Sequence, residues 1–508
     1  MLSPRARTAR RSLAAAALLG VLADPLLRNG PWGLGLLVWM AALAVAIAVL
    51  MHRVGRPLSA EGYAWLATAV LFAGGLSWRD SEMLYAFDLL AMLSALVLLA
   101  LNLSAVPVPG LAPARIRDLI QSAFGTGLDV ATGAPRLLIR DAELHTALPP
   151  VTGVRRTARA LAITIPILLV FTLLLTSADP VFGSLVTLPD WDFAELFSHL
   201  LVAGFFAWVV AGWFRRSLLV PPAGPDAPTT PFPLTLGTTD VALALGALAV
   251  LFGAFVAVQI GWLFGGEALV LRTTGLSYAD YARRGFFELM WVAGLLLPVL
   301  LGAQALIHAS DTRTLRLYRR LALILTVLLG AIMASAFARM ALYLRYYGIS
   351  TDRLYATAFM IWLVIVFLWL ALTELRGRPR AFALGSVVSG FAVLAVLNVL
   401  NPDALVARAN LARAGRAGAA GTDLRYVASL GGDAVPQVVA ALMTPDTARY
   451  SAGSDLCTAA GLLLERWTGE RRDRADGDWT QWNMGRKRAT EAVHAHAMEL
   501  QRIACAGD

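Results

Sequence analysis

Long apolar runs alternate with short polar stretches through the first 400 positions. The runs are about 16 to 25 residues long and hold very few charged side chains. A helix of about 20 residues crosses the ~30 Å hydrocarbon layer of a membrane, where lipid cannot satisfy an open backbone. The runs are too long and too uniformly apolar for barrel strands. The predicted fold is therefore all-α, a polytopic transmembrane helix bundle.

We expect eleven membrane spans. They are residues 12–27, 33–51, 61–77, 83–103, 158–176, 195–214, 240–264, 286–307, 321–344, 354–373 and 381–399. The first run follows a basic start and is interrupted by Asp24 and Pro25. We interpret it as a membrane helix, and a cleaved signal peptide is the alternative.

The spans and the segments between them divide the chain into four parts. Residues 104–157 form a loop in which Arg115–Phe124 has the apolar spacing of a helix. This helix either lies on the membrane surface or packs against helix ends. In the tail, helical patterns occur near 424–442, 454–467 and 488–503. The four parts are 1–103 with four spans, the loop 104–157, 158–400 with seven spans, and a small helical tail at 401–508.

Composition and charge agree with this class and add an orientation. The chain is 58% hydrophobic and 15% charged, which excludes an ordinary soluble enzyme. With the N-terminus inside, arginines of the inner segments outnumber those of the outer loops by about three to one. The net charge of +9 is then explained by topology, and we expect no nucleic-acid partner. An odd number of spans places the tail outside the cytoplasm.

Two cysteines, Cys457 and Cys505, are both in the tail. An outside compartment is oxidising, so we expect them to form a disulfide. Two free buried thiols are the alternative, because a sequence gives no distance between them.

Polar residues gather near the outer ends of the predicted spans. Ser277 and Asp280 resemble a helix-capping box, and Tyr278 and Tyr281 suit the membrane interface. One interpretation is structural. The segment is an interfacial helix held by an ion-pair ladder, and the charges within the spans fix how the helices pack. The other is an outer-leaflet site for an anionic head group or a lipid-linked substrate. The candidate cluster consists of Asp88, Asp280, Arg283, Arg284, Glu288, Arg339 and Tyr343. Asn398, Asn401 and Asp403 end the last span at the same side.

Common catalytic signatures are missing from the sequence. There is no P-loop, Rossmann glycine fingerprint, His-Glu-x-x-His or Gly-x-Ser-x-Gly motif. His494 and His496 are two residues apart and face different sides of a helix, which disfavours a metal site. We therefore expect no catalytic residue, no metal and no cofactor.

The stretch Ser277–Leu289, Ser-Tyr-Ala-Asp-Tyr-Ala-Arg-Arg-Gly-Phe-Phe-Glu-Leu, resembles the hallmark of bacterial integral membrane proteins catalogued as domain of unknown function 4153 or 4173. The likeness extends through Ala178–Phe182, Leu317–Leu321, Tyr346–Arg353 and Asn401–Arg408, with Asn410 after it. It covers about residues 150–445. The resemblance implies an inner-membrane protein of many helices without an established activity.

The leading functional hypothesis is a non-enzymatic scaffold, sensor or accessory protein of the bacterial envelope, in contact with the lipid bilayer, lipid head groups or other membrane proteins. A transporter or flippase-like carrier is one alternative, although such proteins need broken helices and charges near the midplane. A membrane enzyme for lipid-linked envelope precursors is the other. In it, Asp88, Asp280 or Glu288 would act as acid or base, and Arg284 or Arg339 would hold phosphate.

Overall fold

The computed structural model is helical throughout the residues that it describes. These are residues 3–103, 116–143, 193–220, 235–274, 286–307, 311–373, 379–413, 423–444, 453–469 and 477–504, with the single residues 164, 168 and 376. No β-strand occurs within these ranges. The all-α prediction is confirmed.

Eight helices in the described part of the chain are long and apolar enough to cross a membrane. They are α2 (Leu34–Val54), α4 (Glu82–Leu103), α9 (Phe193–Leu218), α10 (Thr238–Thr274), α12 (Phe286–Leu306), α13 (Thr312–Tyr347), α14 (Thr351–Thr373) and α15 (Pro379–Leu400). Each contains or overlaps a predicted span. Large apolar side chains remain exposed on them, for example Leu243 at 74% and Val250 at 73%, as lipid-facing positions should.

Three predicted spans are not among those eight. Residues 12–27 and 61–77 are helical, within α1 (Pro4–Leu27) and α3 (Ala60–Trp78). The span predicted at 158–176 lies outside the described residues, apart from 164 and 168. A membrane-spanning chain is thus supported, and the total of eleven stays a prediction.

Polar residues start several of these helices by satisfying backbone N–H groups of the first turn. The Ser59 hydroxyl accepts a hydrogen bond from the Gly62 N–H at 3.0 Å at the start of α3. The Asp311 carboxylate accepts one from the Thr314 N–H at 3.0 Å at the start of α13. Such N-caps fix where an apolar helix begins, which hydrophobicity alone does not determine.

The chain forms two compact units, and neither is continuous in sequence. The first comprises residues 1–28, 42–58 and 126–220. Within it α1 packs along α9. Gly20 allows the close approach, because a Cβ there would lie 2.6 Å from the Ala207 Cβ. Asp24 of α1 contacts both His199 of α9 and Arg28.

One buried acid of this unit binds arginines from two helices. Asp141 ends the π-helix η1 (Leu137–Asp141), which follows α5 (Ile116–Arg136), and its side chain is 5% exposed. Its carboxylate accepts hydrogen bonds from Arg5 Nη2 at 2.7 Å and from Arg215 Nε at 2.8 Å. Asp141 therefore joins the beginning of α1 to the end of α9.

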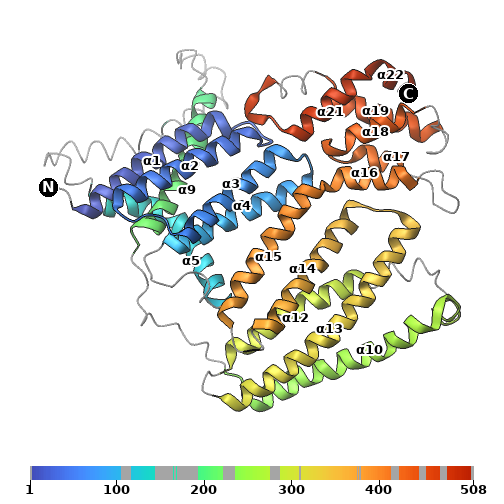
Figure 1. Cartoon of the computed structure of the whole chain (residues 1–508). Coiled ribbons are helices and arrows are strands. Elements are labelled where there is room, and N and C mark those ends of the chain that lie inside the picture. The colour runs from blue at the N-terminus through green and yellow to red at the C-terminus, as the bar shows by residue number, and fades with distance from the viewer. Residues whose placement is uncertain are drawn as a thin grey trace, which may run out of the picture. The chain divides into compact units, whose positions relative to one another are not determined.

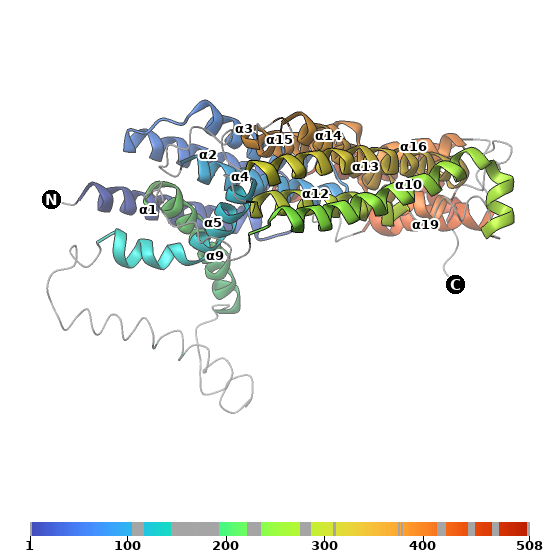
Figure 2. The same ribbon diagram turned by 90° about the horizontal axis from the view of Figure 1, so that it is seen from below.

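The second unit comprises residues 29–41, 59–125 and 221–508. In it α3 and α4 form a hairpin, and α15 packs against both α4 and α14 (Figure 1). Figures 1 and 2 both show α10 and α13 packed together near their starts. The core among α10, α12, α13 and α14 is built from fully buried apolar residues such as Tyr318, Leu325, Leu329 and Met360.

Helices α16 to α22 form a small domain of the second unit that we call the C-terminal cap (Figure 1). They are α16 (Pro402–Arg413), α17 (Leu424–Ser429), the 3-10 helix η2 (Gly432–Ala434), α18 (Val435–Leu442), α19 (Gly453–Trp467), the 3-10 helix η4 (Trp479–Gln481), α21 (Met484–Ala495) and α22 (Ala497–Ile503). Their shared core includes Val406, Val438, Leu463, Trp467 and Leu500. The cap is therefore a packed globular element, with helices where the tail pattern predicts them.

Candidate functional site

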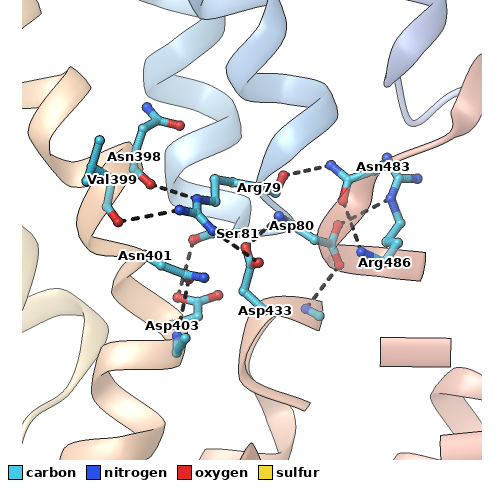
Figure 3. A network of polar contacts seen from close by, with 12 residues as sticks. Arg79, Asp80, Ser81, Asn398, Val399, Asn401, Asp403, Asp433, Asn483 and Arg486 are labelled. Carbon is cyan, nitrogen blue, oxygen red and sulfur yellow. Dashed lines mark hydrogen bonds and ion pairs between the residues drawn. The ribbon is translucent and has the colours of Figure 1, made fainter. Parts of the chain in front are cut away.

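The turn between α3 and α4 consists of three polar residues, Arg79, Asp80 and Ser81. Figure 3 shows them against the junction of α15 and α16, against η2, and against the start of α21. Four segments that are far apart in the sequence thus meet at one place within the second unit. We call their polar side chains the hairpin network: Arg79, Asp80, Ser81, Asn398, Asn401, Asp403, Asp433, Asn483 and Arg486.

Arg79 caps the C-terminal end of α15. Its Nε donates to the Asn398 carbonyl at 2.7 Å and its Nη2 to the Val399 carbonyl at 3.4 Å. The last carbonyls of a helix have no partner inside the helix, and that end carries a partial negative charge. A guanidinium supplies both the donors and the positive charge. The Arg79 side chain is 8% exposed, so this contact is almost fully shielded from solvent.

Asn483 caps the C-terminal end of α3. Its side-chain amide donates to the Leu76 carbonyl at 2.9 Å and to the Arg79 carbonyl at 2.8 Å. Its amide oxygen accepts from the Arg486 N–H at 3.0 Å, which makes Asn483 the N-cap of α21. One buried side chain therefore ends α3 and begins a helix of the C-terminal cap.

Asp80 and Asp433 bind each other's segments reciprocally. The Asp80 N–H donates to the Asp433 carboxylate at 2.8 Å, and the Gly432 N–H donates to the Asp80 carboxylate at 3.0 Å. Each acid also faces a guanidinium, Asp433 that of Arg79 at 3.8 Å and Asp80 that of Arg486 at 3.4 Å. The arrangement fixes the register between the hairpin turn and η2.

Asp403 connects the same turn to α16. Asn401 has φ +55°, a left-handed conformation that asparagine tolerates, and it separates α15 from α16. Its side-chain oxygen accepts from the Ala404 N–H at 3.4 Å, so it caps α16. Asp403, two residues on, then accepts from the Ser81 hydroxyl at 3.2 Å and from the Gly431 N–H at 3.0 Å.

Burial has the largest effect on the pKa values of Asp403 and Asp433. It raises the pKa of Asp403 to about 6, although the hydrogen bonds from Gly431 and Ser81 act in the opposite direction. Burial also raises the pKa of Asp433, against the lowering effects of the Asp80 N–H and of Arg79. Both carboxylates are therefore costly to keep ionised, even though they are well hydrogen-bonded.

Three glycines allow the C-terminal cap to approach the hairpin turn at backbone distance. A Cβ on Gly431 would collide with the Asp80 carbonyl, and one on Gly432 would lie 2.6 Å from the Asp80 carboxylate. A Cβ on Gly485 would lie 2.9 Å from the Asp433 carboxylate. Side chains at these positions would separate the two surfaces and break the backbone hydrogen bonds of the network.

Asp88 and Asn398 form a second, deeper contact between α4 and α15. The Asn398 amide donates to the Asp88 carboxylate at 2.7 Å, and Asp88 is 1% exposed. Gly75 on α3 leaves space for this pair, since a Cβ there would collide with the Asp88 carboxylate. The pair lies about two turns below the hairpin turn and joins the hairpin to α15.

Three members of the cluster predicted from the sequence lie in three different surroundings. Asp88 contacts Asn398, as described above. Arg339 on α13 donates from Nη2 to the Gln259 side-chain oxygen at 3.1 Å. Glu288 is exposed at the start of α12. Asp280, Arg283, Arg284 and the side chain of Tyr343 lie outside the described residues. The outer-leaflet cluster as a whole stays a prediction.

Cysteines were the other predicted site. Cys457 lies on α19 and is disulfide-bonded. Cys505 lies outside the described residues, so the identity of the bonding partner stays a prediction.

Six of the nine residues of the hairpin network stand out in the sequence, and three do not. Asn398, Asn401 and Asp403 stand out as polar residues at the end of the last span. Arg79, Asp80 and Ser81 form a compact polar turn between two apolar runs, and this turn was a usable signal. Asp433, Asn483 and Arg486 are common residue types in a polar tail, and only the folded chain shows which of them reach the membrane helices.

The polar groups of the network bind one segment of the chain to another. Its acids accept backbone N–H groups, and its guanidinium and amide groups donate to helix carbonyls. These interactions bring together the C-termini of α3 and α15, the N-termini of α16 and α21, and a glycine-rich turn. Such an arrangement holds elements in place rather than presenting an acid–base pair to a cavity.

Comparison with known proteins identifies a family. The sequence profile of the family described as Domain of unknown function (DUF4153) matches residues 66–441. The match starts within α3, well before residue 150 where the resemblance was expected to begin, and so includes the hairpin turn and all of the network up to Asp433. No curated protein and no solved structure matches the chain. With nearly three quarters of its length matched, the chain belongs to the DUF4153 family.

Proposed function

We propose that this protein is a non-enzymatic scaffold or accessory protein of the bacterial inner membrane, which presents its C-terminal cap on the outer side of that membrane. The observation that carries the proposal is the hairpin network. Buried charged and polar side chains are arranged to fasten a packed domain to the end of a membrane hairpin. A buried polar set of this kind favours one fixed geometry over alternatives.

The distribution of arginine supports the orientation. Eleven spans with the N-terminus in the cytoplasm leave basic residues inside and the cap outside. In this orientation the hairpin turn lies at the outer interface. Trp78, Trp479 and Trp482 are partly exposed there, at 38%, 55% and 36%. Exposed tryptophans beside helix ends suit the aromatic belt of a membrane interface, which supports a cap resting on the outer surface.

A complementation experiment tests this function. A deletion strain receives the wild-type gene, R79M, or the lipid-site variants R284A and E288A, and its envelope and lipid composition are compared quantitatively. R425M is the matched control, because Arg425 is an exposed arginine of the same cap. Protein amounts in the membrane are made equal by adjusting expression.

The scaffold proposal expects R284A, E288A and R425M to complement fully and R79M to fail. Loss of complementation by R284A or E288A at normal protein levels would instead favour an enzyme or lipid carrier that uses the outer-leaflet cluster. Full complementation by R79M would show that fixing the cap is not what the cell requires.

A further inference from the structure

An apolar groove of about 790 Å³ lies in the second unit between α4 and α14, with α15 as its floor. Each helix contributes one stripe of residues at helical spacing. On α14 the stripe is Tyr355, Ala358, Phe359 and Trp362, the i, i+3, i+4, i+7 pattern of a face that needs a partner. The volume falls within the ~300–1,000 Å³ that is usual for small-molecule sites.

The groove lies at membrane depth and opens sideways. On α4 it extends from Phe87 to Leu101, about 21 Å at 1.5 Å per residue, within a helix that can cross the ~30 Å hydrocarbon layer. Leu90 and Leu93 at its edge are 62% and 49% exposed. Its opening therefore faces the position of lipid and not of water.

The walls of the groove are fixed. At the end nearest the hairpin network, Leu84, Tyr355 and Leu397 form a buried cluster, and the rings of Phe87 and Tyr355 are 5.7 Å apart. Further along, the Trp362 indole donates to the Ser389 hydroxyl at 3.2 Å, which holds the ring in place. Gly390 on α15 has no side chain to fill the groove, and a Cβ there would lie 3.4 Å from the Trp362 indole.

The dimensions suit hydrocarbon chains more closely than a complete helix. A volume of about 790 Å³ over about 21 Å, with a margin of one atomic radius on each side, corresponds to a groove roughly 10 Å wide, whereas a helix with side chains is about 10–12 Å across. A hydrocarbon chain is only about 4 Å thick at van der Waals contact. An apolar volume in a bilayer has no water to fill it, and leaving it empty forfeits the dispersion contacts of its walls.

We propose that this groove binds the acyl chains of a phospholipid from the surrounding bilayer, seated lengthwise between α4 and α14. This site is separate from the hairpin network, and the proposal does not depend on the scaffold function. It predicts a retained lipid rather than one that exchanges as freely as the lipids around α10.

Photolabelling tests the site. The full-length protein is reconstituted into phosphatidylethanolamine–phosphatidylglycerol vesicles that contain a phosphatidylcholine with a diazirine in its acyl chain, and labelled peptides are mapped by mass spectrometry. We expect labelling of the groove-lining residues of α4 and α15 to exceed that of exposed Leu243 and Val250 on α10 by at least severalfold. Equal labelling of the two regions would overturn the proposal, because it would show ordinary surrounding lipid only.

Filling the groove provides the matched comparison. G390L should reduce the groove labelling severalfold, whereas G246L, a glycine of α10 with open space around it, should not. S94F fills the groove from the α4 side and covers the case in which G390L does not fold. Undiminished groove labelling in a folded filled variant would refute the site. The site would also be refuted by a partner protein that copurifies in equal amount with the wild type, prevents lipid labelling of the groove, and is absent from the filled variants.

Discussion

Replacing Asp403 by asparagine should change how the stability of the protein depends on pH. In the folded chain burial raises the pKa of Asp403 from 3.8 to about 6. The folded state therefore holds this proton up to about pH 6, whereas the unfolded chain releases it near pH 4. Between these values the folded state binds more protons, so stability falls as pH rises. Below about pH 4 buried Asp403 does not destabilise the protein, and above about pH 6 its destabilising effect is complete.

The size of this effect follows from the same values. A pKa rise from 3.8 to about 6 corresponds to about 3 kcal/mol of lost stability above pH 6. In D403N the amide oxygen still accepts from the Gly431 N–H, and the Ser81 hydroxyl can accept from the amide. Allowing about 1 kcal/mol for a poorer hydrogen bond, we expect the variant to be more stable than wild type by about 2 kcal/mol at pH 8.

Thermal unfolding of the purified protein in detergent, at pH 4.5 and pH 8, measures this difference. The advantage of D403N over wild type should grow from pH 4.5 to pH 8. The pKa of Asp433 is also raised by burial in both proteins, so the stability of the variant still declines somewhat as pH rises. D455N, on an exposed residue of α19, is the control and should show no such change. A pH-independent difference between D403N and wild type would refute the reasoning.

Four further predictions concern other contacts. R79M leaves the α15 carbonyls and buried Asp433 without their cation and should cost about 3–5 kcal/mol in unfolding experiments, far more than R425M. G432A should lower the unfolding temperature, because its Cβ would lie 2.6 Å from the Asp80 carboxylate; an unchanged temperature would contradict the close packing of the hairpin turn. D141N removes the acid shared by Arg5 and Arg215 and should cost about 3 kcal/mol, whereas R5M, at an arginine that is 52% exposed, should cost under about 1 kcal/mol. Thiol labelling should modify Cys457 and Cys505 only after reduction; labelling of the unreduced protein would exclude their disulfide.

The membrane helices could be predicted from the sequence because hydrophobicity acts locally. A run such as Leu34–Val54 must be helical in lipid whatever surrounds it. The ends of the helices also follow local rules, as at Ser59, Asp311 and Asn401, where a side chain satisfies backbone groups of its own first turn.

The hairpin network could not be predicted in this way because its partners are distant in the sequence. Nothing near Leu76 indicates that its carbonyl pairs with Asn483, and nothing near Arg79 indicates that it caps α15. The cluster expected near Glu288 and Arg339 rested on depth along the helices alone. Depth gives the level of a side chain in the membrane but not the helix face that it shares with others.

The capping of α3 by Asn483 also has a consequence for biosynthesis. The Arg79 carbonyl precedes its partner Asn483 by 404 residues. At about 5–20 residues per second, a ribosome needs roughly 20–80 s to cover that interval. Throughout this time the newly inserted hairpin lacks the donor that completes α3. The α3–α4 hairpin is thus among the last parts of the second unit to be finished, and a chain interrupted before Asn483 leaves the Leu76 and Arg79 carbonyls without this donor.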